Sequence, residues 1–280
     1  ISRGEACLLI GMLKSPTLYR PDTRPREAKK RRDDIIKLME RKKVFTHDEA
    51  ERAYLEELPR KKFELPSRAY HYAELILSQN PGNSQKFETT LNLEAQTKLE
   101  AILRQSLNDF PNEITLAAGI VDNKTADLIA WVGNARFNYD SWVDCGRSPR
   151  SPGSTLKPFA YISAIDAGDL TPSTLLADTS MAFSGRAPRN FDLQYRGAVT
   201  ARIALSESLN APAVRVLRAT GQDKILALMR QSGLRHLTQS ANYYGDSLIL
   251  GGCDVTLLEE LEAFTTISSL GGHRPLRFLK

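Results

Sequence analysis

A serine and a lysine three positions apart are the residues of this sequence best suited to nucleophilic chemistry. Ser154 and Lys157 lie in the stretch RSPGSTLKPF, where the turn formers Pro152 and Gly153 come just before the serine. On a helix, residues i and i+3 share a face, with Cβ atoms about 5–6 Å apart, so the amine can reach the hydroxyl. The positive potential at a helix N-terminus also favours a neutral amine and an anionic serine oxygen. The spacing therefore predicts a serine nucleophile with a lysine base.

Taken alone, this motif is weak. A serine followed three residues later by a lysine occurs about once by chance in a chain of this length, and then it is usually a helix cap beside a solvated lysine. Other nucleophilic and metal chemistries have less support. The chain has no G-x-S-x-G elbow, its 4 histidines form no clear triad or metal-binding spacing, and its 3 cysteines include no C-x-x-C pair.

A serine nucleophile that transfers acyl groups needs a second hydroxyl and an amide, a pair that an S-x-N motif supplies. Only one S-x-N lies between two predicted helices, one over Thr200–Glu207 and one starting at Pro212, where proline suits the first helical turn. We therefore predict that Ser208 and Asn210 complete the site. The S-x-N matches in the chain are Ser78–Asn80, Ser106–Asn108, Ser208–Asn210 and Ser240–Asn242.

The composition is that of a folded globular protein with one large domain or two ordinary ones. Of the 280 residues, 41% are hydrophobic and 25% are charged, and no apolar run reaches the roughly 18–20 residues that span a bilayer. The net charge of the chain is +5, and residues 1–62 alone carry +6, with 17 Lys/Arg against 11 Asp/Glu, so the remainder is near neutral. Because acidic residues alternate with the cations and no aromatic residues are interleaved, a solvated helix face is favoured and no nucleic acid partner is expected.

The order of the predicted elements indicates the fold class. Strands come first and a cluster of helices follows, which predicts an α+β domain with helices packed on an antiparallel sheet. A T-x-x-E capping box at Thr46 marks one helix start. Residues 168–198 are expected to be irregular. The predicted helices are Glu5–Leu13, Pro25–Lys43, Thr46–Glu57, Ala69–Leu77, Leu93–Leu107 and Ser154–Ala167, and the predicted strands are Phe87–Leu91, Ile114–Val121 and Asp127–Val132.

Several stretches of the chain resemble the class A (bifunctional) penicillin-binding proteins, above all those of the 1C type, and their order along the chain is part of the resemblance. RSPGSTLKPF is similar to the nucleophile box of that family, and SESLNAPAV (Ser206–Val214) is similar to its S-x-N box. Three further stretches resemble family segments around these boxes, and the first residues resemble the tail of a family 51 glycosyltransferase. These stretches are Thr89–Gln96, Pro188–Asp192, Leu248–Gly252 and, at the start, Ser2–Pro21.

The resemblance implies a division of the chain. Residues 1–57 would be the C-terminal helices of a glycosyltransferase domain, 58–86 a linker, and 87–280 an incomplete penicillin-binding (transpeptidase) domain related to serine β-lactamases. The third motif of the family, K-[ST]-G, is not found after Ser208, and its nearest match, Lys124–Ala126, precedes Ser154. We therefore expect an internal part of a longer, two-activity enzyme. The alternative is a non-catalytic scaffold or binding fragment.

The resemblance also implies a mechanism and partners. Ser154 would attack the D-Ala-D-Ala carbonyl of a peptidoglycan stem peptide, and Lys157 would take the serine proton. Ser208 would pass a proton to the leaving amine, and Asn210 would hold the substrate amide. The implied partners are stem peptides and glycan strands, with β-lactams as inhibitors and with no metal or cofactor. The implied location is the periplasmic face of the bacterial inner membrane, with a membrane anchor expected in the full-length protein.

Overall fold

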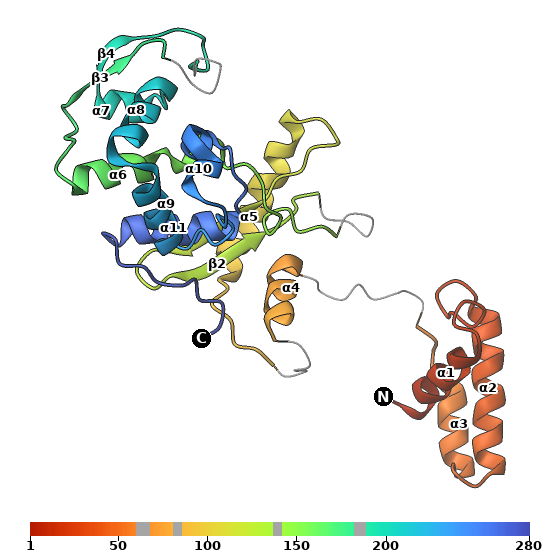
Figure 1. Ribbon diagram of the computed structural model, residues 1–280. Helices are drawn as coiled ribbons and strands as arrows, with labels where there is room; N and C mark the ends of the chain where they lie inside the picture. The colour runs from red at the N-terminus through yellow and green to blue at the C-terminus, as the bar shows by residue number, and fades with distance from the viewer. Residues whose placement is uncertain (60–67, 81–85, 137–141, 182–188) are drawn as a thin grey trace. The chain divides into compact units, whose positions relative to one another are not determined.

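The chain forms two compact units, Ile1–Arg68 and Ala69–Lys280 (Figure 1). The computed structural model describes residues 1–59, 68–80, 86–136, 142–181 and 189–280. Residues 60–67 and 81–85 of the predicted linker lie outside the described residues. The helix that falls inside that linker, α4, packs in the second unit. The assignment of residues 1–57 to a glycosyltransferase stays a prediction.

The first unit is a group of helices around a small core of its own. The predicted capping box at Thr46 is present, and a second box forms where Ser2 and Glu5 bond each other's backbone N–H. The side chains of Ile35 and Ile36 are buried between the helices. The helices are α1 (Arg3–Lys14), α2 (Pro25–Arg41) and α3 (His47–Leu55).

The second unit has the predicted α+β composition, with helices packed against small antiparallel sheets (Figure 1). Its α-helices are α4 (Tyr70–Gln79), α5 (Leu93–Ser106), α6 (Lys157–Asp166), α7 (Ala201–Ser206), α8 (Asn210–Thr220), α9 (Gln222–Gln231), α10 (Ala241–Tyr244) and α11 (Leu257–Ser268). Its strands are β1 (Ala118–Asp122), β2 (Asp127–Val132), β3 (Leu175–Asp178) and β4 (Gly197–Thr200). Short 3-10 helices cover Leu107–Asp109, Gly153–Leu156 and Gly245–Leu250.

Strands β1 and β2 form the predicted hairpin, contacted by α4, α5 and α11. The outer edge of β2 is partly covered by a side chain, because the Gln96 amide bonds both the N–H and the carbonyl of Trp131, at 2.8 and 3.0 Å. This pairing shields an edge that would otherwise offer free backbone groups. The predicted strand Phe87–Leu91 is wrong as a strand. In the described part of this stretch the pairing is an isolated bridge, between Thr89 and Leu279, which does not extend into a ladder.

The second sheet, β3 with β4, was not predicted. It lies within and just after the stretch expected to be irregular, and it pairs Leu175 with Thr200 and Asp178 with Gly197. Each strand is only four residues long, which is too short to show a clear alternating pattern. This sheet brings Asp178 close to the start of α8, because β3 packs on that helix.

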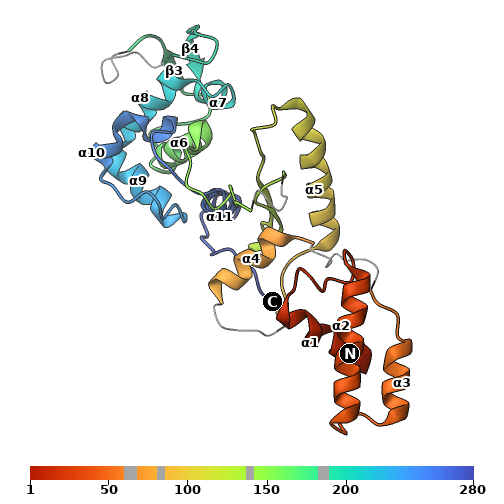
Figure 2. The ribbon, with the colours of Figure 1, turned by 90° about the vertical axis from the view of Figure 1, so that its right-hand side faces the viewer.

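The largest hydrophobic core lies among the helices that carry the predicted site. Helix α6 packs against α7, α8 and α9, and these helices gather together in both views (Figures 1 and 2). Phe159 and Tyr161 of α6 are almost fully buried there, as is Leu217 of α8. This packing places the start of α6 beside the start of α8. Among the residues that the structure describes, no helix is both long and apolar enough to cross a membrane.

Candidate active site

Ser154 is exposed on a 3-10 turn that leads into α6. The prediction of one α-helix from Ser154 to Ala167 is corrected here, since Gly153–Leu156 is a 3-10 helix and α6 begins at Lys157. The cause is Pro158, which has no N–H to give to the Ser154 carbonyl four residues back. That carbonyl instead accepts the N–H of Lys157, the i+3 bond of a 3-10 helix.

Lys157 is buried at the centre of the site, with 1% of its surface exposed. Its Nζ donates to the Ser208 carbonyl at 2.5 Å, to Ser208 Oγ at 3.1 Å and to Asn210 Oδ1 at 2.5 Å. Burial lowers the pKa of Lys157 to about 8. The structure therefore brings three of the four predicted side chains into direct contact. Within the described residues no hydrogen bond joins Lys157 to the hydroxyl of Ser154, which is exposed one helical turn earlier.

Ser208 adopts a left-handed backbone conformation, with φ of +56°. It follows α7 in a capping motif in which its N–H donates to the Leu205 carbonyl and the N–H of Leu209 donates to the Ala204 carbonyl. Glycine usually holds this position, because a Cβ there costs about 1–2 kcal/mol. The turn directs both the carbonyl and the hydroxyl of Ser208 to Lys157. Strain of this kind is often found at functional sites.

Asn210 is the first residue of α8, two residues before the predicted helix start at Pro212. Proline is accepted at the third helical position because the N–H groups of the first turn have no partner inside the helix. The side chain of Asn210 bridges two partners. Its Oδ1 accepts from Lys157, and its Nδ2 donates to the carbonyl of Arg189 at 2.6 Å.

The segment that resembles the family upstream of the S-x-N box contacts Asn210 directly. Pro188 of that segment lies outside the described residues, but Asn190 Oδ1 accepts the backbone N–H of Asn210 at 2.9 Å. Asn190 in turn donates to Asp178 at 2.8 Å. Sequence reasoning did not single out Asn190 or Asp178 as site residues, because no local spacing connects them to Ser208–Asn210.

Two glycines bring the 3-10 turn that carries Ser154 close to the stretch that follows α10. Gly251 has φ of +90°, and a Cβ on it would lie 2.6 Å from the Cα of Gly153. The Ser151 hydroxyl donates to the Gly251 carbonyl at 2.7 Å, and Arg150 pairs with Val255 through two backbone hydrogen bonds of 2.9 Å. The stretch Leu248–Gly252 (LILGG) and the residues after it therefore pack against the residues that lead to Ser154.

A carboxyl group from α11 supports the same turn on another side. Glu260 Oε1 accepts the hydroxyl of Thr155 at 2.5 Å, and burial raises the pKa of Glu260. A cavity of about 480 Å³ next to it is lined by Glu260 and by Arg150, Ser151 and Pro152. No group of three His, Cys, Asp or Glu side chains among the described residues is arranged to hold a metal ion.

The contact between Lys157 and Ser208 can accept and pass on a proton close to the exposed hydroxyl of Ser154. An amine with a pKa of about 8 is partly neutral near neutral pH, so Lys157 can act as a general base. Its contact with Ser208 Oγ offers a second hydroxyl through which the proton can leave.

Comparison with known proteins identifies relatives of the whole chain. The sequence profile of the family described as "Penicillin binding protein transpeptidase domain" matches residues 116–280. Penicillin-binding protein 1C of Escherichia coli K12 is 32% identical over 280 residues, covering 99% of this chain and 36% of the relative. Penicillin-binding protein 1B of Vibrio cholerae is 28% identical, covering 99% of this chain and 38% of the relative. The chain thus spans about a third of the length of these curated relatives.

Solved structures share the fold. Penicillin-binding protein 1A of Haemophilus influenzae matches with a TM-score of 0.67 and 17% identity, covering 95% of this chain and 56% of the other. PonA1 of Mycobacterium tuberculosis matches with a TM-score of 0.63 and 18% identity, covering 76% of this chain and 57% of the other.

Proposed function

This chain belongs to the class A penicillin-binding proteins and contains part of their transpeptidase domain, and from that premise we propose that it serves peptidoglycan cross-linking by D,D-transpeptidation. One observation carries the proposal. Within the region matched by the family profile, the buried amine of Lys157 lies against Ser208 and Asn210, one helical turn after the exposed Ser154. We assign Ser154, Lys157, Ser208 and Asn210 to the catalytic site.

The acylation step follows from these contacts. Ser154 Oγ attacks the carbonyl carbon of the penultimate D-Ala of a stem peptide, and its proton passes to Lys157 Nζ. The C–N bond then breaks, and the departing D-Ala amine takes a proton from Lys157 by way of Ser208 Oγ, which lies 3.1 Å from Nζ. Asn210 keeps the lysine in place and offers its amide to the backbone of the substrate.

The second half-reaction uses the same groups in reverse. An amine from a neighbouring stem peptide attacks the ester carbonyl, and Lys157 removes a proton from that amine. The ester bond breaks, Ser154 recovers its proton, and a new peptide bond joins the two strands. A β-lactam acylates the same serine by opening its ring amide.

The wider assignments rest on the family and are part of the proposal. The substrates are stem peptides on glycan strands. Residues 1–57 belong to the end of a glycosyltransferase domain, and the natural protein works at the periplasmic face of the inner membrane, held by an anchor.

Covalent labelling with a fluorescent penicillin tests the nucleophile on the natural gene product that contains these residues. Ser154→Ala should abolish labelling, because it removes the hydroxyl to which we assign the ester. The matched control is Ser206→Ala, which removes another exposed serine, whose hydroxyl donates to the Ile203 carbonyl of its own helix. If Ser154→Ala labels as strongly as the parent, the assignment is wrong. If the parent itself takes no label, the non-catalytic alternative is favoured.

A further inference from the structure

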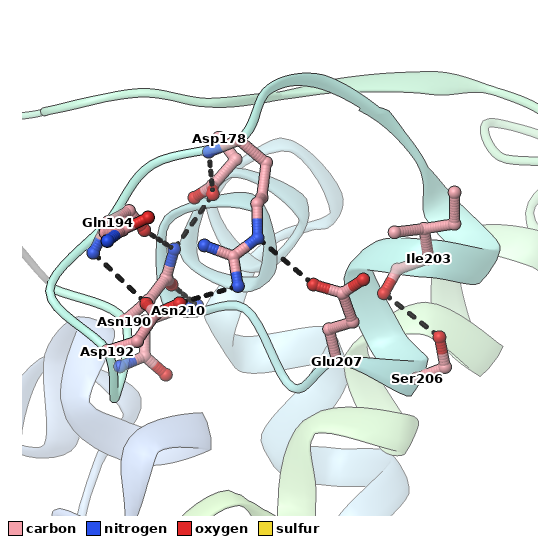
Figure 3. A network of polar contacts seen from close by, with 9 residues as sticks. Asp178, Asn190, Asp192, Gln194, Ile203, Ser206, Glu207 and Asn210 are labelled. Atoms are coloured by element: carbon pink, nitrogen blue, oxygen red, sulfur yellow. Dashed lines mark hydrogen bonds and ion pairs between the residues drawn. The ribbon is translucent and has the colours of Figure 1, made fainter.

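A buried polar network reaches from strand β3 to the start of α8, where it contacts Asn210 of the proposed catalytic site (Figure 3). Its central residue is Asn190, of which 4% is exposed. The Oδ1 of Asn190 accepts the backbone N–H of Asn210 at 2.9 Å. Its Nδ2 donates to Asp178 Oδ2 at 2.8 Å and to the Gln194 carbonyl at 2.7 Å. The carbonyl and amino ends of the Asn190 amide are therefore both engaged.

The partners of Asn190 determine which way its amide points. The carbonyl of Gln194 and the carboxylate of Asp178 can only accept hydrogen bonds, so the NH₂ end of Asn190 must face them. The oxygen end then faces the N–H of Asn210. The reverse orientation would oppose acceptor to acceptor and donor to donor at all of these contacts, which is costly in a buried place.

Asp178 gives the network a fixed anchor. It ends β3 and is fully buried, and its Oδ2 also accepts the backbone N–H of Arg196 at 2.8 Å. A buried carboxylate is stable only when hydrogen bonds or charges satisfy it. Asp178 therefore holds Asn190 and Arg196 together, and with them the turn that leads into β4.

The start of α8 requires an external cap. The residue before the helix is Leu209, which has no side-chain acceptor for the free N–H groups of the first turn. Asn190, twenty positions earlier in the chain, supplies that acceptor to Asn210. The backbone of Asn210 is thus fixed by Asn190, while its side chain holds Lys157.

From these contacts we propose that Asn190, anchored by Asp178, is a positioning residue that keeps Asn210 Oδ1 against the amine of Lys157. This inference rests on the proposed transpeptidase function. Asn190 touches neither Ser154 nor the reacting atoms, so it acts through Asn210. When Asn190 is lost, the first turn of α8 loosens, and water reaches Lys157. Water replaces Asn210 as a hydrogen-bond acceptor, while the Ser208 carbonyl stays, so the main change at the amine is the loss of burial.

The first test removes the amide with Asn190→Ala. Because burial is what lowers the pKa of Lys157, this variant should titrate Lys157 at a higher pH than the parent. A rise of one pH unit leaves about a tenth as much neutral amine at pH 7, so β-lactam acylation should fall roughly tenfold there. The Lys157 titration is read directly from the ¹³Cε signal of labelled lysine, and acylation is read from fluorescent penicillin.

The matched control is Asn92→Ala, which removes another asparagine that caps a helix of the same unit, α5. It should lower the melting temperature but leave the Lys157 titration and the acylation rate as in the parent. If Asn190→Ala also leaves both unchanged, Asn190 is only structural and the proposal is overturned.

A second pair of variants tests the contact even if Asn190→Ala folds poorly. Asn190→Asp turns a carboxylate oxygen toward both Asp178 and the Gln194 carbonyl, which can only accept hydrogen bonds, so this change should slow acylation by tenfold or more. Asp178→Asn is the matched variant: it can keep its oxygen at the Oδ2 position and turn its NH₂ group to the Oδ1 position, which has no hydrogen-bond partner among the described residues, so acylation and the Lys157 titration should stay within about threefold of the parent. An Asn190→Asp variant that acylates as fast as Asp178→Asn would overturn the proposal.

The two hypotheses fail separately in these experiments. A parent protein that takes no penicillin label removes the proposed function, whatever Asn190 does. In that case the Lys157 titration still tells whether Asn190 holds the site, because it needs no substrate. A labelled parent with an unchanged titration in Asn190→Ala removes the role of Asn190 alone.

Discussion

Lys157 is a cation-forming side chain in a place that favours its neutral form. Its amine is buried, and burial is the cause of its lowered pKa, which outweighs the hydrogen bonds that the amine gives to Ser208 and Asn210. A lysine on the surface would stay protonated to about pH 10, and it could not serve as a base near neutral pH. The folding of α6 against α8 is thus what lowers the pKa of this lysine.

This burial predicts a pH dependence. Lys157 accepts a proton only when neutral, and its pKa is about 8. The rate constant for acylation by a β-lactam should therefore rise about tenfold per unit below pH 8 and level off above it. The measurement is acylation at a series of pH values from about 6 to 9.5.

Two lysine variants serve as controls for this pH dependence of acylation. Lys157→Arg should abolish acylation at every pH, because a guanidinium does not lose its proton in this range. Lys224→Arg changes an exposed lysine of α9 and should leave the profile as in the parent. A rate that is flat between pH 6 and 9 in the parent would show that Lys157 is not the base.

At the level of single residues, part of the candidate site could be predicted from the sequence. The spacing of Ser154 and Lys157 is local, so helix geometry could predict that they share a face. The choice of Ser208 and Asn210 among the S-x-N matches relied on their place between two helices, and the structure puts both on Lys157. The left-handed conformation of Ser208 could not be predicted from the sequence, because nothing in its residue type indicates it.

At the level of elements, the 3-10 turn that carries Ser154 depends on contact with a distant stretch. Gly251 packs so closely on Gly153 that only a residue without a Cβ fits, and its positive φ also favours glycine. The contact joins the 3-10 helix before α6 to the residues that follow Gly245–Leu250. The turn that carries Ser154 is thus held by tertiary packing in addition to its own hydrogen bonds.

Gly251→Ala should disturb that turn. The added Cβ would lie 2.6 Å from Gly153 Cα, so the backbone of one segment must move. We expect a loss of stability of about 1–3 kcal/mol and slower acylation of Ser154, measured by denaturant unfolding and by penicillin labelling. The matched control is Gly168→Ala, where φ is +78° but a Cβ meets nothing within 4 Å. Equal slowing in both variants would mean that backbone strain, and not the contact with Gly153, is responsible.

The elements were predicted unevenly, for a physical reason. Helices with capping boxes and the hairpin β1–β2 have local patterns, and the structure contains them. Sheet β3–β4 and the link from Asp178 through Asn190 to Asn210 join residues far apart in the chain. Such contacts depend on the packed fold, so no window of sequence reveals them. Pro158 differs from these contacts because its effect is local. Its missing N–H explains the 3-10 turn, although the turn was recognised only from the structure.

At the level of the whole molecule, each compact unit has a core of its own. The first unit is packed around residues such as Ile36, and the second contains the larger core with Leu217. Both side chains are fully buried. The proposed chemistry lies entirely in the second unit, whose core holds α6 and α8 together.

Separate cores predict separate effects of core mutations. In the 280-residue chain, Ile36→Ala should destabilise the first unit by about 2–5 kcal/mol, because it leaves a cavity among packed helices. It should leave the rate of penicillin labelling at Ser154 unchanged. Leu217→Ala is the matched variant of the second unit; it should lower a different calorimetric transition and reduce labelling. Variants that shift every transition together would show that the two units unfold as one cooperative body, and that the division of the core into independent parts does not hold.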